Sequence, residues 1–230
     1  MSAAQAVPLR DRPWVRRIRR GLGDLAARLN PAARAAQTRW VTTDGPAFLV
    51  SLGARPGACV VDVGCGAGHY ALSAAAAVGP AGAVWCVDRD PWALARMRRA
   101  AAGVPNLRPA ASVEDVLPHL PPGGADLVLL FDMLHFQDAP GRRELYGRVR
   151  EALGPAGRLA VHPTHTRERH PQRHFASLSV EDVVREIEAC GFAVGRRLPA
   201  RLWHNRGRED GAVWIFTRAA DAGPVAGRAL

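Results

Sequence analysis

The sequence predicts an α/β fold in which a doubly wound sheet is flanked by helices on both faces. Apolar, β-branched segments of strand length alternate with longer segments of helical character from residue 46 onward. A turn with three glycines joins the first strand to a helix, and the second strand ends in an aspartate. A chain of 230 residues, 48% of them hydrophobic, can bury one such domain together with an extension.

The first predicted strand and the turn after it are the most informative part of the chain. The strand covers residues 58–63 and carries Asp62 near its end. Glycines then occupy alternate positions, at Gly64, Gly66 and Gly68. Glycine permits a sharp turn and leaves no Cβ between the main chain and a ligand. Because an Ala-rich helix is predicted next, from Tyr70 to Val78, this arrangement is typical of a nucleotide-binding site.

The second predicted strand, residues 83–88, supports a nucleotide site. It is apolar and ends in Asp88, about twenty residues after the last glycine, where a carboxylate can accept both hydroxyls of a ribose. Asp90 is a suitable N-cap for the following helix, and Pro91 is suitable for its first position.

The remaining elements continue the alternation. Strands are predicted over residues 107–111, 126–131 and 158–161, helices over 141–153 and 179–189, and a final pair of strands over 193–198 and 212–217. Ser179 is the expected N-cap of the last helix, with acidic residues in its first turn.

Two features of the glycine turn distinguish it from a dinucleotide site. A G-x-G-x-x-G pattern starting at Gly64 would need glycine at position 69, where the chain has His69. A carboxylate such as Asp62 would repel a pyrophosphate but would suit a cationic ligand. The acidic residue followed by G-x-G-x-G resembles motif I of the class I S-adenosylmethionine (SAM) methyltransferases. An NAD(P) site is the alternative.

The resemblance covers about Pro46 to Arg218. The segment 131–136 is similar to the region after the fourth strand in small-molecule methyltransferases of ubiquinone and menaquinone biosynthesis, and 153–157 is similar to the family's turn before the fifth strand. The resemblance implies a Rossmann-like seven-stranded sheet in which the last strand is antiparallel. The expected organisation is a helical extension over 1–45, a methyltransferase domain over 46–218 and a flexible tail over 219–230.

The resemblance also implies which residues contact SAM. They lie around the carboxyl ends of the first four strands: Asp62, Gly64, Cys65, Gly66, Gly68, His69, Tyr70, Asp88, Arg89, Ser112, Val113 and Phe131. The family often has an aspartate after the third strand that accepts the adenine amino group. Since Ser112 stands there, Ser112 and the Val113 backbone are expected to hold the adenine.

Candidate catalytic residues follow the fourth and fifth strands. Ligands of open sheets lie at the carboxyl ends of the strands, so Asp132, His135, His162 and His165 are expected around the acceptor. His135 is the preferred general base if the acceptor must lose a proton, because imidazole titrates near neutrality. Asp132 and His162 are the other candidates. The alternative is that His135 only packs.

Four histidines fall between residues 162 and 174, a density that raises the question of a metal site. The positions are His162, His165, His170 and His174. Their spacing matches no helical metal-binding pair, the prolines favour a loop, and three intervening arginines disfavour a cation. No metal site is therefore expected.

The N-terminal extension is basic and amphipathic. Up to Trp40 it has nine arginines against two aspartates, which accounts for seven of the ten net positive charges of the chain. Trp14, Ile18, Leu22 and Leu25 fall on one helical face. Asn30-Pro31 should end this helix, and a second short helix is expected over residues 32–38. The preferred role is a lid or packing helix, and the alternatives are contact of residues 10–29 with an anionic membrane or with phosphates.

The sequence therefore predicts methyl transfer from SAM to a small molecule. The alternatives are an RNA or protein methyltransferase that docks through the basic arm, and a SAM-binding protein without catalysis. The first ten residues lack an apolar signal core and no segment resembles a transmembrane helix, so a cytoplasmic location is expected. Every basic residue is arginine, which is typical of a GC-rich bacterial genome.

Overall fold

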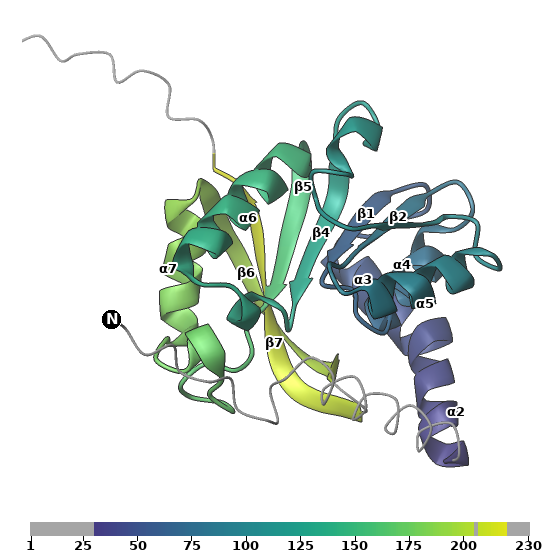
Figure 1. The fold of residues 1–230 in the computed structure, drawn as a ribbon, viewed down its shortest axis with the longest axis horizontal. Helices are drawn as coiled ribbons and strands as arrows, with labels where there is room; N and C mark the ends of the chain where they lie inside the picture. Colours follow the sequence, from purple (N-terminus) through teal and green to yellow (C-terminus); the bar gives the residue numbers. More distant parts are fainter. Residues whose placement is uncertain (1–29, 205–206, 220–230) are drawn as a thin grey trace, which may run out of the picture.

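The computed structural model describes residues 30–204 and 207–219, which form a seven-stranded sheet flanked by helices on both faces (Figure 1). The strand order is β3-β2-β1-β4-β5-β7-β6. Strands β1 to β5 pair in parallel, and β7 runs antiparallel to both β5 and β6. The predicted doubly wound sheet with a reversed last strand is confirmed.

The strands and helices have the following bounds. The strands are β1 (Cys59–Val63), β2 (Ala83–Val87), β3 (Leu107–Ala110), β4 (Ala125–Phe131), β5 (Leu153–His162), β6 (Phe192–His204) and β7 (Gly207–Arg218). The α-helices are α2 (Pro31–Arg39), α3 (Gly45–Leu52), α4 (His69–Val78), α5 (Pro91–Ala101), α6 (Ala139–Ala152) and α7 (Val180–Ala189). Shorter turns of helix are η2 (Trp40–Asp44), η3 (Leu117–His119), η4 (Leu134–Phe136) and η5 (Arg173–Phe175).

Each face of the sheet has its own apolar core. Helices α3, α4 and α5 bury Leu49, Ala74 and Met97 against one face, and α6 and α7 bury Tyr146 and Ile187 against the other. All five residues of β1 are buried because the strand has helices above and below it. The strand therefore holds the turn that follows it in a fixed position.

The predicted helix caps are present. The Asp90 side chain accepts a hydrogen bond from the Trp92 N–H at 3.0 Å, and Pro91 is the first residue of α5. At α7, Ser179 Oγ accepts from the Asp182 N–H at 3.0 Å while the Asp182 carboxylate accepts from the Ser179 N–H at 2.8 Å. This reciprocal pair is a capping box, which satisfies two backbone donors at the helix start.

Replacing the α7 cap gives the first testable prediction. We expect Ser179→Ala to lower the free energy of unfolding by about 1 kcal/mol, because a backbone donor at the helix start loses its acceptor. Ser177→Ala is the matched control, since Ser177 is exposed and lies just before the helix. Urea unfolding of both variants measures the difference. Equal stability of the two would show that the cap contributes nothing.

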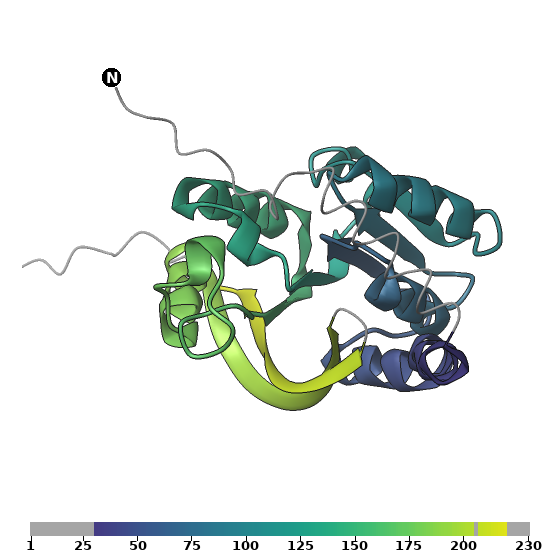
Figure 2. The ribbon, with the colours of Figure 1, turned by 60° about the horizontal axis from the view of Figure 1, so that its bottom comes forward.

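The final hairpin is much longer than the sequence predicts. Strands were expected over 193–198 and 212–217, whereas β6 and β7 are 13 and 12 residues long. The hairpin curves away from the sheet towards α2 and α3 (Figure 2). There, Arg208 forms an ion pair with Asp44 at 2.8 Å, and Arg196 donates to the Ser51 carbonyl at 2.5 Å. The hairpin thus covers the edge of the sheet where β4 and β5 end.

The segment before α3 packs on the domain. The predicted short helix over residues 32–38 is present as α2, and its N-cap Asn30 accepts from the Ala32 and Ala33 N–H groups. Trp40 is 1% exposed and contacts Tyr70 edge-on, with ring centroids 5.6 Å apart. The predicted helix with Trp14 to Leu29 lies outside the described residues, as does the tail beyond residue 219. The domain boundary at residue 45 stays a prediction.

Candidate active site

The glycine turn between β1 and α4 has the backbone conformation that only glycine adopts readily. Gly64, Gly66 and Gly68 have φ values of 78°, 50° and 81°. A Cβ on Gly64 would lie 2.7 Å from Met133 Cβ, so the turn packs directly against the segment after β4. The N-cap of α4 is Gly68, which has no side chain to cap the helix. The Ala71 N–H in the first turn donates to the Asp62 carboxylate, and the start of the helix offers further N–H groups to a polar ligand.

Asp62 is a buried carboxylate with an unused acceptor. The side chain is 3% exposed, and Oδ2 makes no hydrogen bond within the described chain. Burial, together with the nearby charge of Asp88, raises the pKa of Asp62 to about 7. Such a group is costly to ionise alone, and a bound cation would stabilise its charged form.

Asp88 connects the end of β2 to the glycine turn. Its Oδ2 accepts from the Gly66 N–H at 2.9 Å, and its Oδ1 accepts from the Asp90 N–H at 2.8 Å. Each carboxylate oxygen has a second lone pair, so both remain able to accept hydroxyl groups. Asp62, Gly66 and Asp88 are thus brought together as predicted.

Other predicted cofactor residues lie at the ends of β2 and β3. Ser112 and Asp115 exchange two hydrogen bonds, from the Ser112 N–H to Oδ2 at 3.1 Å and from the Asp115 N–H to Oγ at 3.2 Å. The Val113 side chain is buried, whereas Arg89 is exposed. The Ser112 hydroxyl therefore organises its own turn, and its contact with adenine stays a prediction.

The side chains of His69 and Tyr70 point towards the final hairpin. The Tyr70 hydroxyl donates to the Trp203 carbonyl at 3.0 Å, and its ring meets Phe131 edge-on with centroids 4.7 Å apart. The His69 ring lies 4.8 Å from that of Trp203. Cys65 is buried beside them. Any cofactor contact of His69 and Tyr70 is therefore expected through their backbone N–H groups.

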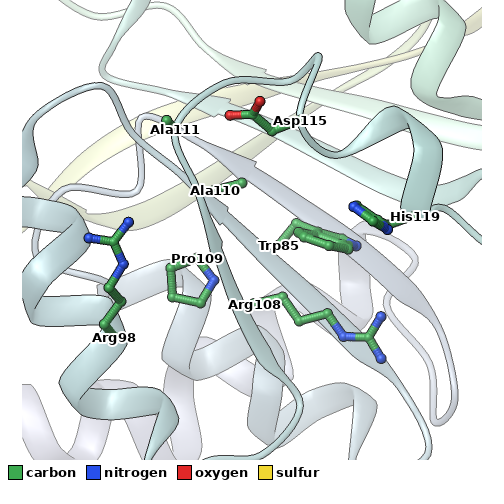
Figure 3. Close-up of a pocket in the computed structure, with 8 residues that line it drawn as sticks. All are labelled: Trp85, Arg98, Arg108, Pro109, Ala110, Ala111, Asp115 and His119. Atoms are coloured by element: carbon green, nitrogen blue, oxygen red, sulfur yellow. The ribbon is translucent and has the colours of Figure 1, made fainter.

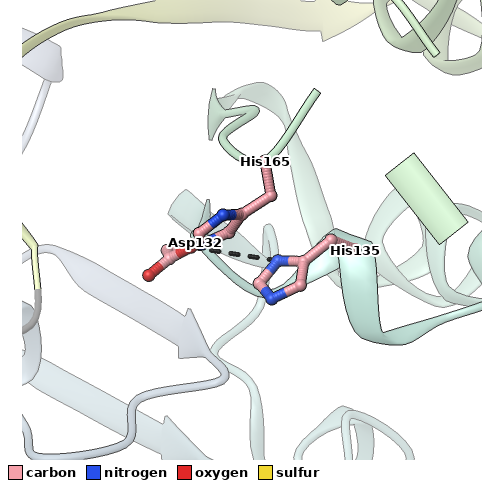
Figure 4. Close-up of side chains that lie close together, drawn as sticks. All are labelled: Asp132, His135 and His165. Carbon is pink, nitrogen blue, oxygen red and sulfur yellow. Dashed lines mark ion pairs between the residues drawn. The ribbon is translucent and has the colours of Figure 1, made fainter. Parts of the chain in front are cut away.

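Asp132, directly after β4, is the centre of a cluster of imidazole rings (Figure 4). Its Oδ1 lies 3.1 Å from His165 Nε2 and 3.8 Å from His135 Nδ1, and its Oδ2 lies 2.9 Å from His204 Nε2. Asp132 and His165 both have positive φ, 53° and 64°, a strained conformation for residues other than glycine. The fold brings together Asp132, His135 and His165 as the sequence predicted, and adds His204.

Burial and charge set the protonation of this cluster. Burial raises the pKa of Asp132, but the hydrogen bonds from His165 and His204 outweigh it and hold that pKa below its usual range. Hydrogen bonds to Asp132 and Glu209, opposed by burial, raise the pKa of His204 to about 9. Burial lowers the pKa of His135 to about 4, so this imidazole is neutral near pH 7. A group with so low a pKa is a weak general base.

The side chain of His162, the third predicted catalytic residue, contacts strand β7. Its Nδ1 lies 2.8 Å from the Ala212 carbonyl on β7, and a Cβ on Gly211 would touch the ring. Burial lowers its pKa. His162 therefore fastens β5 to the hairpin beside the cluster, and its role in catalysis stays a prediction.

Trp203 and His204 were not predicted as site residues because the expected hairpin strand ended at residue 198, whereas β6 continues to His204. A period-two pattern was available: Leu198, Ala200 and Leu202 are more buried than the residues between them. Extending this pattern places His204 on the strand. Trp40 was missed because nothing local marks it as packing against Trp203.

A separate pocket of about 420 Å³ lies along β3, the edge strand of the sheet (Figure 3). Trp85 stacks on His119 there, with centroids 5.7 Å apart, and Arg108 lies over the Trp85 ring. None of its lining residues belongs to the glycine turn or to the Asp132 cluster. Asp115, which bonds to Ser112, is one of the lining residues, so the pocket adjoins the turn predicted to hold the adenine.

Parts of the chain are similar to known methyltransferases. Residues 60–157 match a family model described as "Methyltransferase domain". The ribosomal RNA small subunit methyltransferase H of Halorhodospira halophila (strain DSM 244 / SL1) is 40% identical over 77 residues. That match covers 32% of this chain and 24% of the relative, so only about a quarter of that protein is represented here.

Two solved structures share the fold over most of the chain. A SAM-dependent methyltransferase from Aquifex aeolicus is 21% identical with a TM-score of 0.62, covering 86% of this chain and 98% of that one. Magnesium protoporphyrin IX methyltransferase from Synechocystis PCC 6803, solved with bound S-adenosylhomocysteine, is 18% identical with a TM-score of 0.56, covering 80% and 84%. At sequence identities of 21% and 18%, these two similarities show that the fold is shared and nothing more.

Proposed function

Because residues 60–157 match a methyltransferase domain and the fold is that of solved SAM-dependent methyltransferases, we propose that the chain transfers the methyl group of SAM to a small-molecule acceptor. The observation that carries this proposal is the pair of strand-end carboxylates around the glycine turn. Asp62 offers a buried, unpartnered oxygen, and Asp88 holds the turn through the Gly66 N–H. The Asp132 cluster begins one strand away, at the end of β4, which pairs directly with β1.

The residues present fit SAM. Asp62 would face the positive charge of the ligand, and Asp88 would accept the ribose hydroxyls. Gly64 and Gly66 leave the main chain open, and the first turn of α4, whose N-cap Gly68 has no side chain, supplies N–H donors. SAM supplies an electrophilic methyl group, whose bond to sulfur breaks with the electron pair remaining on the sulfur.

The surroundings of Asp132 favour a small acceptor. The side chains of His135, His165 and His204 are 4%, 7% and 10% exposed, whereas the Asp132 carboxylate is 30% exposed. The β6–β7 hairpin contributes His204 to the cluster and covers this edge of the sheet. A reactive group held in this half-enclosed site would be kept in one orientation, which supplies much of the acceleration in a displacement reaction.

Asp132 and His135 are proposed to position the acceptor, and His135 to take a proton only where the acceptor carries one. We expect His135→Ala to lower kcat about tenfold while SAM affinity stays unchanged, because the ring is far from ideal as a base but lies in the acceptor site. Exposed His174→Ala is the control. An unchanged kcat would mean that His135 only packs.

An RNA acceptor is the second candidate. The His135→Ala variant does not distinguish an RNA acceptor from a small-molecule acceptor. The relative that is 40% identical is a ribosomal RNA methyltransferase, and the N-terminal arm is rich in arginine. Such an enzyme would bind RNA with strong salt dependence. A full-length variant with Arg16, Arg17, Arg19 and Arg20 changed to glutamine should then lose turnover, whereas turnover of a small molecule should persist.

The experiment that tests the proposal uses labelled SAM and a cell extract separated into small-molecule, RNA and protein fractions. Label in the small-molecule fraction supports the proposal. Label confined to RNA or protein overturns the small-molecule acceptor, and SAM binding without label in any fraction would indicate a non-catalytic SAM-binding protein.

A bacterial, cytoplasmic setting is also proposed, from the exclusive use of arginine and from the four cysteines, none of which forms a disulfide. Among residues 30–204 and 207–219, no helix is long and apolar enough to span a bilayer. Contact of residues 10–29 with a membrane surface stays an alternative role for the arm. Vesicle co-sedimentation of the full chain would detect it.

A further inference from the structure

The Asp132 carboxylate faces two imidazole rings that reach it from different segments. Asp132 and His135 follow β4, and His165 lies in the loop after β5 (Figure 4). Each offers one ligand atom, and these atoms all lie within 4.8 Å of one another. Two imidazole nitrogens and one carboxylate oxygen are a ligand set for divalent first-row transition metals.

His135 supplies an independent observation. The residue is 3% exposed, and its Nδ1 makes no hydrogen bond within the described chain although it is fully buried. A buried polar atom without a partner costs about 1–3 kcal/mol. The same nitrogen points at the carboxylate, 3.8 Å from Asp132 Oδ1. Two ligands bound to zinc at about 2.0–2.1 Å would be roughly 3.3 Å apart, so a small movement would suffice.

Neighbouring groups hold two of the three ligands in a suitable orientation. His165 Nδ1 lies 3.0 Å from the His170 carbonyl, and because a carbonyl only accepts, this nitrogen carries a hydrogen. Nε2 lies 3.1 Å from Asp132 Oδ1, and the ion would take the place of the hydrogen that joins these two atoms. His204 holds Asp132 Oδ2 at 2.9 Å, which turns Oδ1 towards the two rings. Glu209 in turn holds His204 Nδ1 at 3.0 Å. Metal ligands are usually supported by hydrogen bonds of this kind.

The arginines that made a cation unattractive in the sequence have other partners in the structure. Arg167 pairs with Glu168 at 3.3 Å and Arg169 pairs with Glu209 at 3.2 Å. The Arg173 guanidinium lies over the Phe136 ring, 4.9 Å from its centroid. Arg167 and Arg169 are therefore paired with carboxylates, whereas the charge of Arg173 still acts on His135, whose ring lies 4.0 Å from that of Phe136.

We propose that Asp132 Oδ1, His135 Nδ1 and His165 Nε2 bind one divalent transition-metal ion, with His204 and the His170 carbonyl as supporting groups. Three protein ligands leave coordination positions open, as in catalytic metal sites. Gly64 packs against Met133, so the ion would lie next to the cofactor turn. Assigning an open position to an oxygen or nitrogen of the acceptor rests on the proposed function, whereas metal binding itself does not.

The test is calorimetric titration of the full chain, produced without a histidine tag and stripped with chelator, using Zn²⁺. We expect one ion per chain, with affinity at least a hundredfold weaker in His165→Ala and in Asp132→Asn. Loss of the supporting group in His204→Gln should weaken binding about 10–100-fold. His174→Ala, an exposed histidine close to the same loop, should bind like the wild type.

Two further measurements keep the test decisive. SAM is titrated into the same samples, so that retained SAM binding with lost Zn²⁺ binding shows a folded variant and separates the metal site from the methyltransferase function. If His165→Ala does not fold, Co²⁺ is added to the wild-type chain and to Asp132→Asn, and the visible absorption of the bound ion is compared. We expect the absorption of bound Co²⁺ in the wild type and its loss in Asp132→Asn. Absence of Zn²⁺ and Co²⁺ binding to the wild type, or equal binding by wild type and ligand variants, would overturn the proposal.

Discussion

Asp88→Ala is expected to weaken SAM binding by two or more orders of magnitude. Removing the carboxylate deletes the acceptors that we propose for two ribose hydroxyls, and a hydrogen bond to a charged group contributes roughly 1.5–3 kcal/mol. The Gly66 N–H also loses its partner at 2.9 Å, so the turn becomes less well held. Calorimetry with SAM measures the loss directly.

The conservative variant Asp88→Asn separates these two effects. Its amide oxygen can still accept from the Gly66 N–H, but the second oxygen is replaced by a donor. The amide nitrogen cannot accept from the Asp90 N–H, so we expect a melting temperature lower by roughly a few degrees, and SAM affinity at least tenfold reduced. Binding by Asp88→Ala within about threefold of the wild type would show that Asp88 only shapes the turn.

Asp62→Asn is expected to have opposite effects on cofactor binding and on stability. The pKa of Asp62 is raised to about 7, so in the folded chain the group stays protonated at pH values where the unfolded chain is already ionised. Asp62 therefore makes the free energy of unfolding fall as pH rises from about 4 to about 7. The neutral amide removes this fall, and the ligand-free variant should melt higher than the wild type at pH 8, by roughly 2–4 °C per kcal/mol.

SAM binding of the wild type should show the same ionisation. Below pH 7, binding a cation must first remove the proton from Asp62, so affinity should fall by up to about tenfold per pH unit between 7.5 and 5.5. Asp62→Asn should bind more weakly at pH 7.5 and show a flat profile. Glu188→Gln, an exposed acid on α7, serves as the control. An unchanged pH profile in Asp62→Asn would remove Asp62 from the cofactor site.

The positions of the glycine turn and its two carboxylates could be predicted from sequence because these residues are close together along the chain. Asp62, Gly64 and Gly66 are fixed by one strand and one turn, and Asp88 follows at the end of the next strand. Local chemistry and the alternation of strands and helices are sufficient to place them. The caps at Asp90 and Ser179 were predictable for the same reason.

The composition of the Asp132 cluster, in contrast, depends on which strands become neighbours in the sheet. Asp132 meets His165 because β4 pairs with β5, and it meets His204 because the β6–β7 hairpin continues past the sheet and curves over this edge. Strand order and hairpin length are set by tertiary packing, for example that of Trp203 against Trp40. A prediction that shortened the hairpin could not place His204, nor could it recognise the ligand set around Asp132.

Calorimetric titration of the full chain with SAM, and separately with NAD⁺ and NADP⁺, tests the central claim most directly. We predict one SAM bound per chain in the micromolar range, with no measurable heat for either dinucleotide. Tight binding of NAD⁺ or NADP⁺ without binding of SAM would contradict the assignment of Asp62, the glycine turn and Asp88 to a SAM site.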